Sequence, residues 1–245
     1  MCYNVSTKKV TKETEKQFKA KIDPEITLPS NYYLSGFTNP LVPIISAIQP
    51  KIITAFNWGL IPDFCKNEIE AKDMQAKTLN ARSETVFTLP SFKNSIREKR
   101  CLVIVDGFYE WRTIGKQKYP YFIHYKDSEV FAMGGIFNDW VNKQTGEIHN
   151  TFSIITTPAN VLMGKIHNEK MRMPFILPKG LEQTWLNSNL KDSEIVDLMK
   201  PLAEGELMAN TISKLITNKN KNPDTANIQM EFEYPELEFM DKLEK

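Results

Sequence analysis

The sequence predicts an α+β fold built as a single domain. The chain has 245 residues, of which 41% are hydrophobic and 25% are charged, and this is enough to bury one substantial core. Short apolar segments typical of strands alternate with short helical segments, and no internal repeat or low-complexity linker separates them. We therefore expect one body over residues 1–224 and an acidic tail over residues 225–245.

The composition argues against several classes of protein. No apolar run is long enough to cross a bilayer and no targeting segment is recognisable, so we expect a cytoplasmic protein without membrane association. Three cysteines and three histidines show neither paired spacing nor a ligand pattern, so we expect no disulfide, no metal site and no cofactor. The net charge of +1 divides into −4 for the tail and +5 for the body, which permits binding to a polyanion without requiring it.

Hydrophobic periodicity and the positions of proline and glycine predict the secondary structure. Helices are predicted at residues 11–22, 68–78, 91–100, 181–190 and 193–202, with a short one before residue 167. Strands are predicted at residues 41–48, 51–58, 101–105, 119–125, 130–140, 151–155, 175–177 and 207–216. Among these strands, residues 101–105 form a continuous apolar run typical of a buried centre. Residues 119–125 and 130–140 are predicted to pair as a hairpin with its turn at Asp127-Ser128.

The candidate reactive centre is the start of the chain, Met1-Cys2. If Met1 is removed, Cys2 carries an α-amine and a thiol that can both condense with one aldehyde. The amine forms an imine and the thiol closes on the imine carbon, which gives a five-membered thiazolidine. The alternative is that Cys2 is an ordinary residue of an unstructured chain end, and the rest of the chain decides between the two.

Two segments carry side chains suited to a nucleotide. Trp58 ends a predicted strand beside a glycine turn, where it either packs in the core or offers a stacking surface to a base. Asn80 and Arg82 lie two residues apart, so in an extended segment their side chains point to one face. An amide and a guanidinium group there suit a sugar and its phosphate. The alternative for Asn80 is a helix cap.

Glu110 and His167 are candidates for proton transfer. Glu110 stands between aromatic residues after a predicted buried strand, where burial would raise its pKa and let the carboxyl group shuttle protons near neutral pH. The alternative is a carboxylate that faces water at a strand edge. His167 lies where a short helix passes into a loop, and it is either structural or catalytic.

Five motifs occur in order along residues 2–178. They are the N-terminal Met-Cys, Trp58-Gly59-Leu60-Ile61-Pro62, Asn80-Ala81-Arg82-Ser83-Glu84-Thr85, Asp106-Gly107-Phe108-Tyr109-Glu110-Trp111, and His167 with Arg172-Met173-Pro174. Together they resemble the SOS-response-associated peptidase (SRAP) family. The resemblance implies a mostly antiparallel, barrel-like sheet flanked by helices. It also implies a protein that senses abasic sites in single-stranded DNA and becomes covalently crosslinked to them.

The resemblance also implies a role for each matching residue. Cys2 would form the crosslink and Asn80 would position the sugar. Arg82 would hold an adjacent phosphate, Glu110 would handle protons around the imine, and His167 would assist ring opening and reversal.

Three further residues receive roles in binding DNA. Trp58 would be a stacking surface, Thr156 would help to shape the pocket, and Arg172 would meet the DNA. The chain departs from the family pattern at Tyr3-Asn4, where many members have Gly-Arg, so we expect one phosphate contact to be lost.

Three functions are compatible with the sequence. The first is an abasic-site crosslinking activity with slow lyase cleavage in the DNA damage response, carried out by a monomer that joins the nucleoid when engaged. The second is a thiol peptidase in which Cys2 attacks an amide with His167 as base, including removal of Met1. The third is a non-catalytic nucleic-acid binder. We prefer the first, because an amide-attacking nucleophile gains nothing from a position at the chain terminus.

Overall fold

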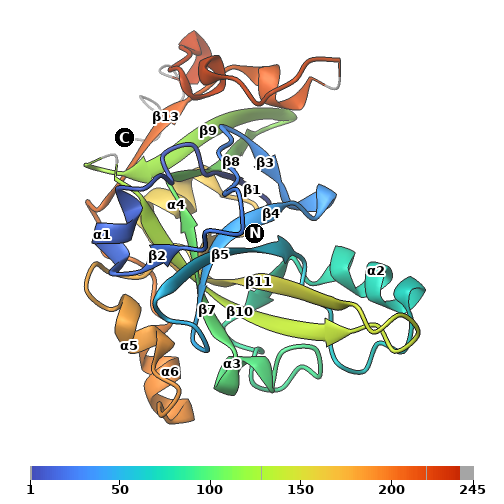
Figure 1. Cartoon of the computed structure of the whole chain (residues 1–245). Coiled ribbons are helices and arrows are strands. Elements are labelled where there is room, and N and C mark those ends of the chain that lie inside the picture. Colours follow the sequence, from blue (N-terminus) through green and yellow to red (C-terminus); the bar gives the residue numbers. More distant parts are fainter. Residues whose placement is uncertain (1, 128, 219, 238–245) are drawn as a thin grey trace.

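Two β-sheets that share one hydrophobic core form the body of the computed structural model, which describes residues 2–127, 129–218 and 220–237 (Figure 1). The five-stranded sheet runs in the order β13 (Leu207–Thr211), β9 (Gln117–Tyr125), β8 (Gly107–Ile114), β1 (Asn4–Ser6), β3 (Leu34–Ser35). The larger sheet runs in the order β12 (Arg172–Pro174), β11 (Ile148–Pro158), β10 (Phe131–Val141), β7 (Arg100–Val105), β4 (Leu41–Ser46), β5 (Ile52–Trp58), β2 (Lys21–Ile22). A further strand, β6 (Asn80–Arg82), pairs with β11.

Short helices surround the sheets, with α5 and α6 lying together at a distance from α2 (Figure 1). They are α1 (Thr14–Phe18), α2 (Glu68–Lys77), α3 (Ser95–Glu98), α4 (Val161–Ile166), α5 (Glu182–Leu186) and α6 (Asp192–Leu198). The chain also contains the 3₁₀ turns η1 (Gly36–Thr38), η2 (Lys214–Thr217) and η3 (Ala226–Gln229). Within the described ranges, no helix is long and apolar enough to cross a bilayer, and no group of three or more metal-ligating side chains is gathered.

The predicted fold class is confirmed, and so is its central strand. Every residue of β7 is buried, and the strand is flanked by β4 on one side and β10 on the other. A strand covered on both faces needs a continuous apolar run, which is what residues 101–105 supply. Most strand pairs are antiparallel, and the parallel ones are β11 with β5, β11 with β6 and β2 with β5.

The predicted hairpin between residues 119–125 and 130–140 is wrong. β9 pairs with β8 and β13, whereas β10 pairs with β7 and β11, so the two strands lie in different sheets. The hairpin partner of β9 is β8, joined through a tight turn in which Gly115 adopts a φ of 58°. A short glycine turn between two alternating segments favours pairing of those segments over pairing with a later one. Of the predicted turn, Ser128 lies outside the described residues.

Several helical predictions were too long. The helix predicted over residues 11–22 is the single turn α1, which ends where Lys19 adopts a left-handed φ of 53°. Ile22 still packs against the core, but it does so from β2, which runs parallel to β5. The helices predicted at 91–100, 181–190 and 193–202 likewise shorten to α3, α5 and α6, and the strand predicted at 207–216 ends as β13 at residue 211.

Part of the acidic tail packs against the body. In Figure 1 the C-terminal segment (red) lies beside β9 and β13. The Phe232 amide donates to the Thr211 carbonyl at 2.9 Å, and the Tyr234 hydroxyl donates to the Ile212 carbonyl at 2.8 Å. Residues 238–245 lie outside the described residues, and the division at residue 224 stays a prediction.

Candidate active site

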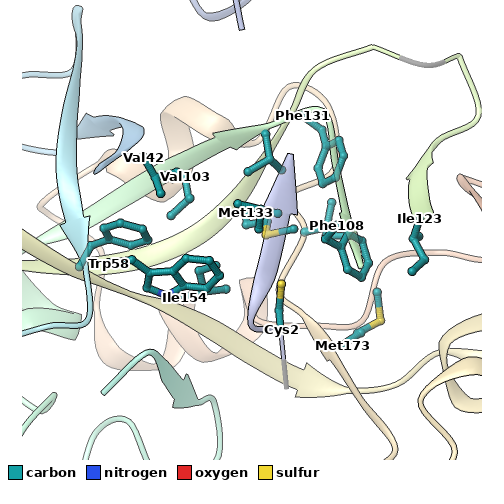
Figure 2. Close-up of a cluster of buried hydrophobic side chains, with 14 of the residues drawn as sticks. Cys2, Val42, Trp58, Val103, Phe108, Ile123, Phe131, Met133, Ile154 and Met173 are labelled. Carbon is teal, nitrogen blue, oxygen red and sulfur yellow. The ribbon is translucent and has the colours of Figure 1, made fainter. Parts of the chain in front are cut away.

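Strand β1 places Cys2 inside the molecule. β1 lies between β3 and β8, with Asn4 opposite Ser35 and Val5 opposite Phe108. Cys2, just before this strand, is 0% exposed and belongs to the main hydrophobic cluster (Figure 2). Burial, together with the charge of Glu110, raises the pKa of the Cys2 thiol far above its ordinary value. The side chain is therefore held in a fixed place as a neutral thiol. Met1 lies outside the described residues.

Asn80 fixes the backbone of Cys2. It lies on β6, and the next helix along the described chain is α3, which begins at Ser95, so the alternative of a helix cap is wrong. Its side-chain Nδ2 donates to the Cys2 carbonyl oxygen at 2.8 Å. Its Oδ1 is buried and has no hydrogen-bond partner among the described residues. Arg82, two positions along, is exposed, and its charge acts on Tyr3.

Glu110 is a buried carboxyl group on β8. It is 5% exposed, so the alternative of a strand-edge residue facing water is wrong. Burial raises its pKa to about 8, because removal from water disfavours the charged form. Near neutral pH, most of the Glu110 population is therefore protonated and can donate a proton.

His167 faces Glu110 from the end of α4. Its Nδ1 lies 2.8 Å from the Arg172 carbonyl oxygen, and because a carbonyl can only accept, Nδ1 carries the proton. In the neutral ring Nε2 is then the basic nitrogen, and it lies 3.9 Å from Glu110 Oε2. Burial lowers the pKa of His167, so the ring is neutral at physiological pH.

Arg172 and Thr156 form a buried support beside this pair. Arg172 is 9% exposed, and its Nη2 donates to the Thr156 carbonyl at 2.6 Å, to Thr156 Oγ1 at 3.0 Å and to Glu84 Oε2 at 3.0 Å. The guanidinium group is thus held by the protein, and the contact between Arg172 and DNA stays a prediction. Both residues instead fix β12 against β11, and with it the carbonyl that orients His167.

Trp58 lies in the core rather than at a DNA-binding surface. It is 0% exposed, its indole nitrogen donates to the Leu79 carbonyl at 2.8 Å, and its ring stacks on Phe152 with centroids 6.0 Å apart. A ring with no exposed face cannot stack on a base, so the core interpretation is correct and the DNA-stacking one is wrong. Its hydrogen bond instead fixes the backbone of Leu79, the residue that precedes Asn80.

A cleft of about 430 Å³ opens next to the Glu110–His167 pair. Its lining includes Tyr3, Phe37, Glu110, Trp111, His167 and Lys170. Tyr3, the residue after Cys2, therefore lines the same cleft as Glu110 and His167, the two groups suited to proton transfer. Sequence reasoning missed Phe37, because an isolated exposed phenylalanine carries no local signal and only the folding of distant segments brings it here.

Comparison with known proteins identifies the family. The model of the SOS response associated peptidase (SRAP) family matches residues 1–219. The chain belongs to this family. The abasic site processing protein YoqW of Bacillus subtilis (strain 168) is 38% identical over 204 residues, which cover 82% of this chain and 87% of that protein. The abasic site processing protein HMCES of Gallus gallus is 34% identical over 173 residues, which cover 62% of this chain and 50% of that protein.

Solved structures share the fold of this chain. A crystal structure of a protein from Bacteroides thetaiotaomicron superposes with a TM-score of 0.88 at 37% identity, covering 95% of this chain and 100% of that one. A protein from Bordetella bronchiseptica superposes with a TM-score of 0.73 at 22% identity, covering 86% of this chain and 100% of that one. The second likeness shows a shared fold alone.

In this SRAP family member, a segment beyond the family match supports β1. The Asp224 carboxylate accepts three hydrogen bonds from residues 31–33, at 2.7, 2.7 and 3.1 Å. The Tyr33 hydroxyl in turn donates to Asn4 Oδ1 at 2.7 Å, and Gln229 Nε2 donates to Ser6 Oγ at 2.9 Å. Asn4 is buried and committed to this network. The strand that follows Cys2 is therefore braced at both ends.

Proposed function

We propose that this SRAP protein captures the aldehyde of an abasic site in single-stranded DNA as a thiazolidine on Cys2. The supporting observation is that Asn80 binds the Cys2 carbonyl while Glu110 and His167 meet at 3.9 Å in the adjoining cleft. The names of the relatives, abasic site processing proteins, indicate the same class of substrate. An abasic deoxyribose supplies the aldehyde whenever its ring opens.

The chemistry needs no oxidant and no cofactor. Removal of Met1 turns the amide nitrogen of Cys2 into a primary amine, which adds to the sugar aldehyde to give a carbinolamine. Loss of water gives the imine. The sulfur then bonds to the imine carbon, and the thiol proton passes to nitrogen to give the thiazolidine. The net change is the joining of two molecules with release of one water.

The burial of the sulfur sets the order of these steps. Burial and the Glu110 charge raise the pKa of the thiol, so a free thiolate is disfavoured as the first nucleophile. An α-amine has a pKa of roughly 7.7–8.0, so a useful fraction is neutral at cellular pH. The amine therefore attacks first, and the imine it forms brings the carbon within reach of a sulfur already held in place, which makes ring closure intramolecular.

Glu110 and His167 then divide the proton transfers. Protonated Glu110 donates a proton to the carbinolamine hydroxyl group, which departs as water. Neutral His167, with Nε2 as its basic nitrogen, accepts a proton from the sugar hydroxyl as the ring opens. The same imine allows slow elimination of the 3′ phosphate, which would cleave the strand as a lyase does.

Asn80 and Arg82 bind the substrate in this scheme. The amide of Asn80 is oriented by the Cys2 carbonyl, which leaves its buried Oδ1 to accept a hydrogen bond from the sugar. The exposed Arg82 holds a phosphate, so binding weakens as salt concentration rises.

A peptidase is the weaker alternative. Attack on an amide requires a thiolate, and the buried Cys2 thiol has a raised pKa, whereas reactive cysteines have lowered ones. A peptidase would also have no use for the terminal amine.

The test is adduct formation by Met1-processed protein and a single strand with one abasic site. We expect a product that survives SDS without a reductant. Cys2→Ala keeps the amine but lacks sulfur, so it should form only an imine that is trapped by borohydride. Cys101→Ala is the matched control, because Cys101 is equally buried in the same cluster and should crosslink normally. A stable adduct from Cys2→Ala without borohydride would contradict the proposal.

A further inference from the structure

Two aromatic rings lie together at the mouth of the cleft. The rings of Tyr3 and Phe37 have centroids 4.9 Å apart and an interplanar angle of 32°. Phe37 is 67% exposed although it contacts another ring, and both residues line the same cleft as Glu110 and His167. The pair thus presents an aromatic surface to solvent beside the proposed reacting groups.

The support under Phe37 is rigid. The Gly36 amide donates to the Tyr3 carbonyl at 2.8 Å, which ties η1 to the start of β1. A Cβ on Gly36 would lie 3.1 Å from the Trp58 ring, so this turn rests directly on the buried indole. Asn39 closes the turn, and its Nδ2 donates to the Trp58 carbonyl at 2.7 Å. The fold therefore keeps Phe37 exposed, and Trp58 supports the turn that carries it.

The charges around the rings indicate the kind of ligand. Lys170 and Lys118 line the cleft, Lys118 with Glu169 as a partner at 3.6 Å, and the exposed Arg82 acts on Tyr3. An exposed aromatic ring bordered by cations matches a nucleobase whose phosphates lie alongside, since every base offers a π face and a single strand carries its charge on the backbone.

We infer that Tyr3 and Phe37 form a stacking subsite for the base next to the abasic residue. The inference rests on the proposed function and adds the part of the strand that flanks the lesion. The position is suitable, because Tyr3 directly follows Cys2 in the chain and both rings line the cleft that holds Glu110 and His167.

The test measures noncovalent binding of the Met1-processed protein to a single strand containing tetrahydrofuran, an abasic analogue that has no aldehyde. Fluorescence anisotropy gives the affinity, and 2-aminopurine beside the analogue reports stacking by quenching. We expect Phe37→Ala to weaken binding by about 5- to 150-fold and to relieve the quenching. Phe37→Leu should behave similarly because it lacks a ring, whereas Phe37→Trp should retain both signals.

The control is Phe64→Ala, which removes another exposed phenylalanine, 50% exposed and outside the cleft, and should leave both signals unchanged. Because Phe37 carries no charge, the salt dependence of binding should be the same in Phe37→Ala and the wild type. A thermal melt of each variant that matches the wild type separates the loss of stacking from misfolding.

The outcomes separate the inference from the proposed function. Normal binding and quenching in Phe37→Ala would overturn the subsite even if the wild type crosslinks to abasic DNA. Loss of quenching in Phe37→Ala, together with no adduct from the wild type, would keep the subsite and overturn the crosslinking. A wild type that neither binds the strand nor forms an adduct would overturn both.

Discussion

Asp106 and Glu110 are two buried carboxyl groups four residues apart, and they differ in what surrounds them. Burial raises the pKa of both. Asp106 Oδ2 accepts the Lys9 amide at 3.0 Å, and the Asp106 amide donates to the Ser6 carbonyl at 3.0 Å, so this residue joins the turn between β7 and β8 to the N-terminal segment. Glu110 instead lines the cleft and faces His167.

The comparison shows that burial alone does not make a carboxyl group a candidate for catalysis. A perturbed pKa appears at structural and functional sites alike. Glu110 differs because it has access to a cleft and a second titratable side chain at 3.9 Å. Isosteric substitution of each carboxyl group by its amide separates the two roles.

The largest difference is expected in the rate of adduct formation. Glu110→Gln removes the proton donor for loss of water, so the single-turnover rate should fall by about 10²- to 10⁴-fold. Asp106→Asn leaves the cleft unchanged and should keep the rate within about threefold at a temperature where it is folded. Rapid-quench sampling followed by denaturing electrophoresis gives both rates. Equal losses in the two variants would remove the distinction drawn here.

The pH dependence of stability should also separate Glu110 from its amide. Folding raises the pKa of Glu110 from an ordinary value of about 4.3 to about 8. Between these pH values the unfolded chain has released a proton that the folded chain keeps. The contribution of Glu110 to the free energy of unfolding therefore falls as pH rises from about 4.3 to about 8 and is constant above about 8. Glu110→Gln should lose this slope, whereas the contributions of Asp106 and His167 remain in both proteins. Urea unfolding at several pH values measures it, and identical slopes would contradict the raised pKa.

A third carboxylate extends the comparison with the smallest expected effect. Asp224 is half-buried and accepts three hydrogen bonds from residues 31–33, so it should behave as Asp106 does. Asp224→Ala should lower the free energy of unfolding by about 1–3 kcal/mol while the adduct rate changes by less than about threefold. Thermal melts and the rapid-quench assay measure the two quantities. A large loss of rate in a stable variant would show that the brace on β1 also sets the position of Cys2.

Local chemistry was readable from the sequence, whereas contacts between distant segments were not. The buried strand at residues 101–105, the raised pKa of Glu110 and the place of His167 at the end of a helix all follow from neighbouring residues. Periodicity and composition report the character of a segment, not its partner. They therefore gave the wrong hairpin for β9, because strand pairing depends on which segments pack together.

The places of Trp58 and Arg172 also depend on distant partners. Trp58 beside a glycine turn is compatible with both the surface and the core, and only Phe152 and Leu79, distant in sequence, decide between them. Arg172 is held by Glu84, 88 residues away along the chain, and local spacing does not reveal that partner. In the same way, Phe37 acquires a role only when η1 is placed beside Tyr3.

The most direct test of the account is the intact mass of the product from two forms of the protein, with and without an extra residue before Cys2. Mature protein incubated with abasic single-stranded DNA should give a species equal to the sum of both masses minus one water, without any reductant. The form whose Cys2 nitrogen remains an amide should give none. The same adduct in equal yield from the blocked form would contradict the claim that the terminal amine and the adjacent thiol act together.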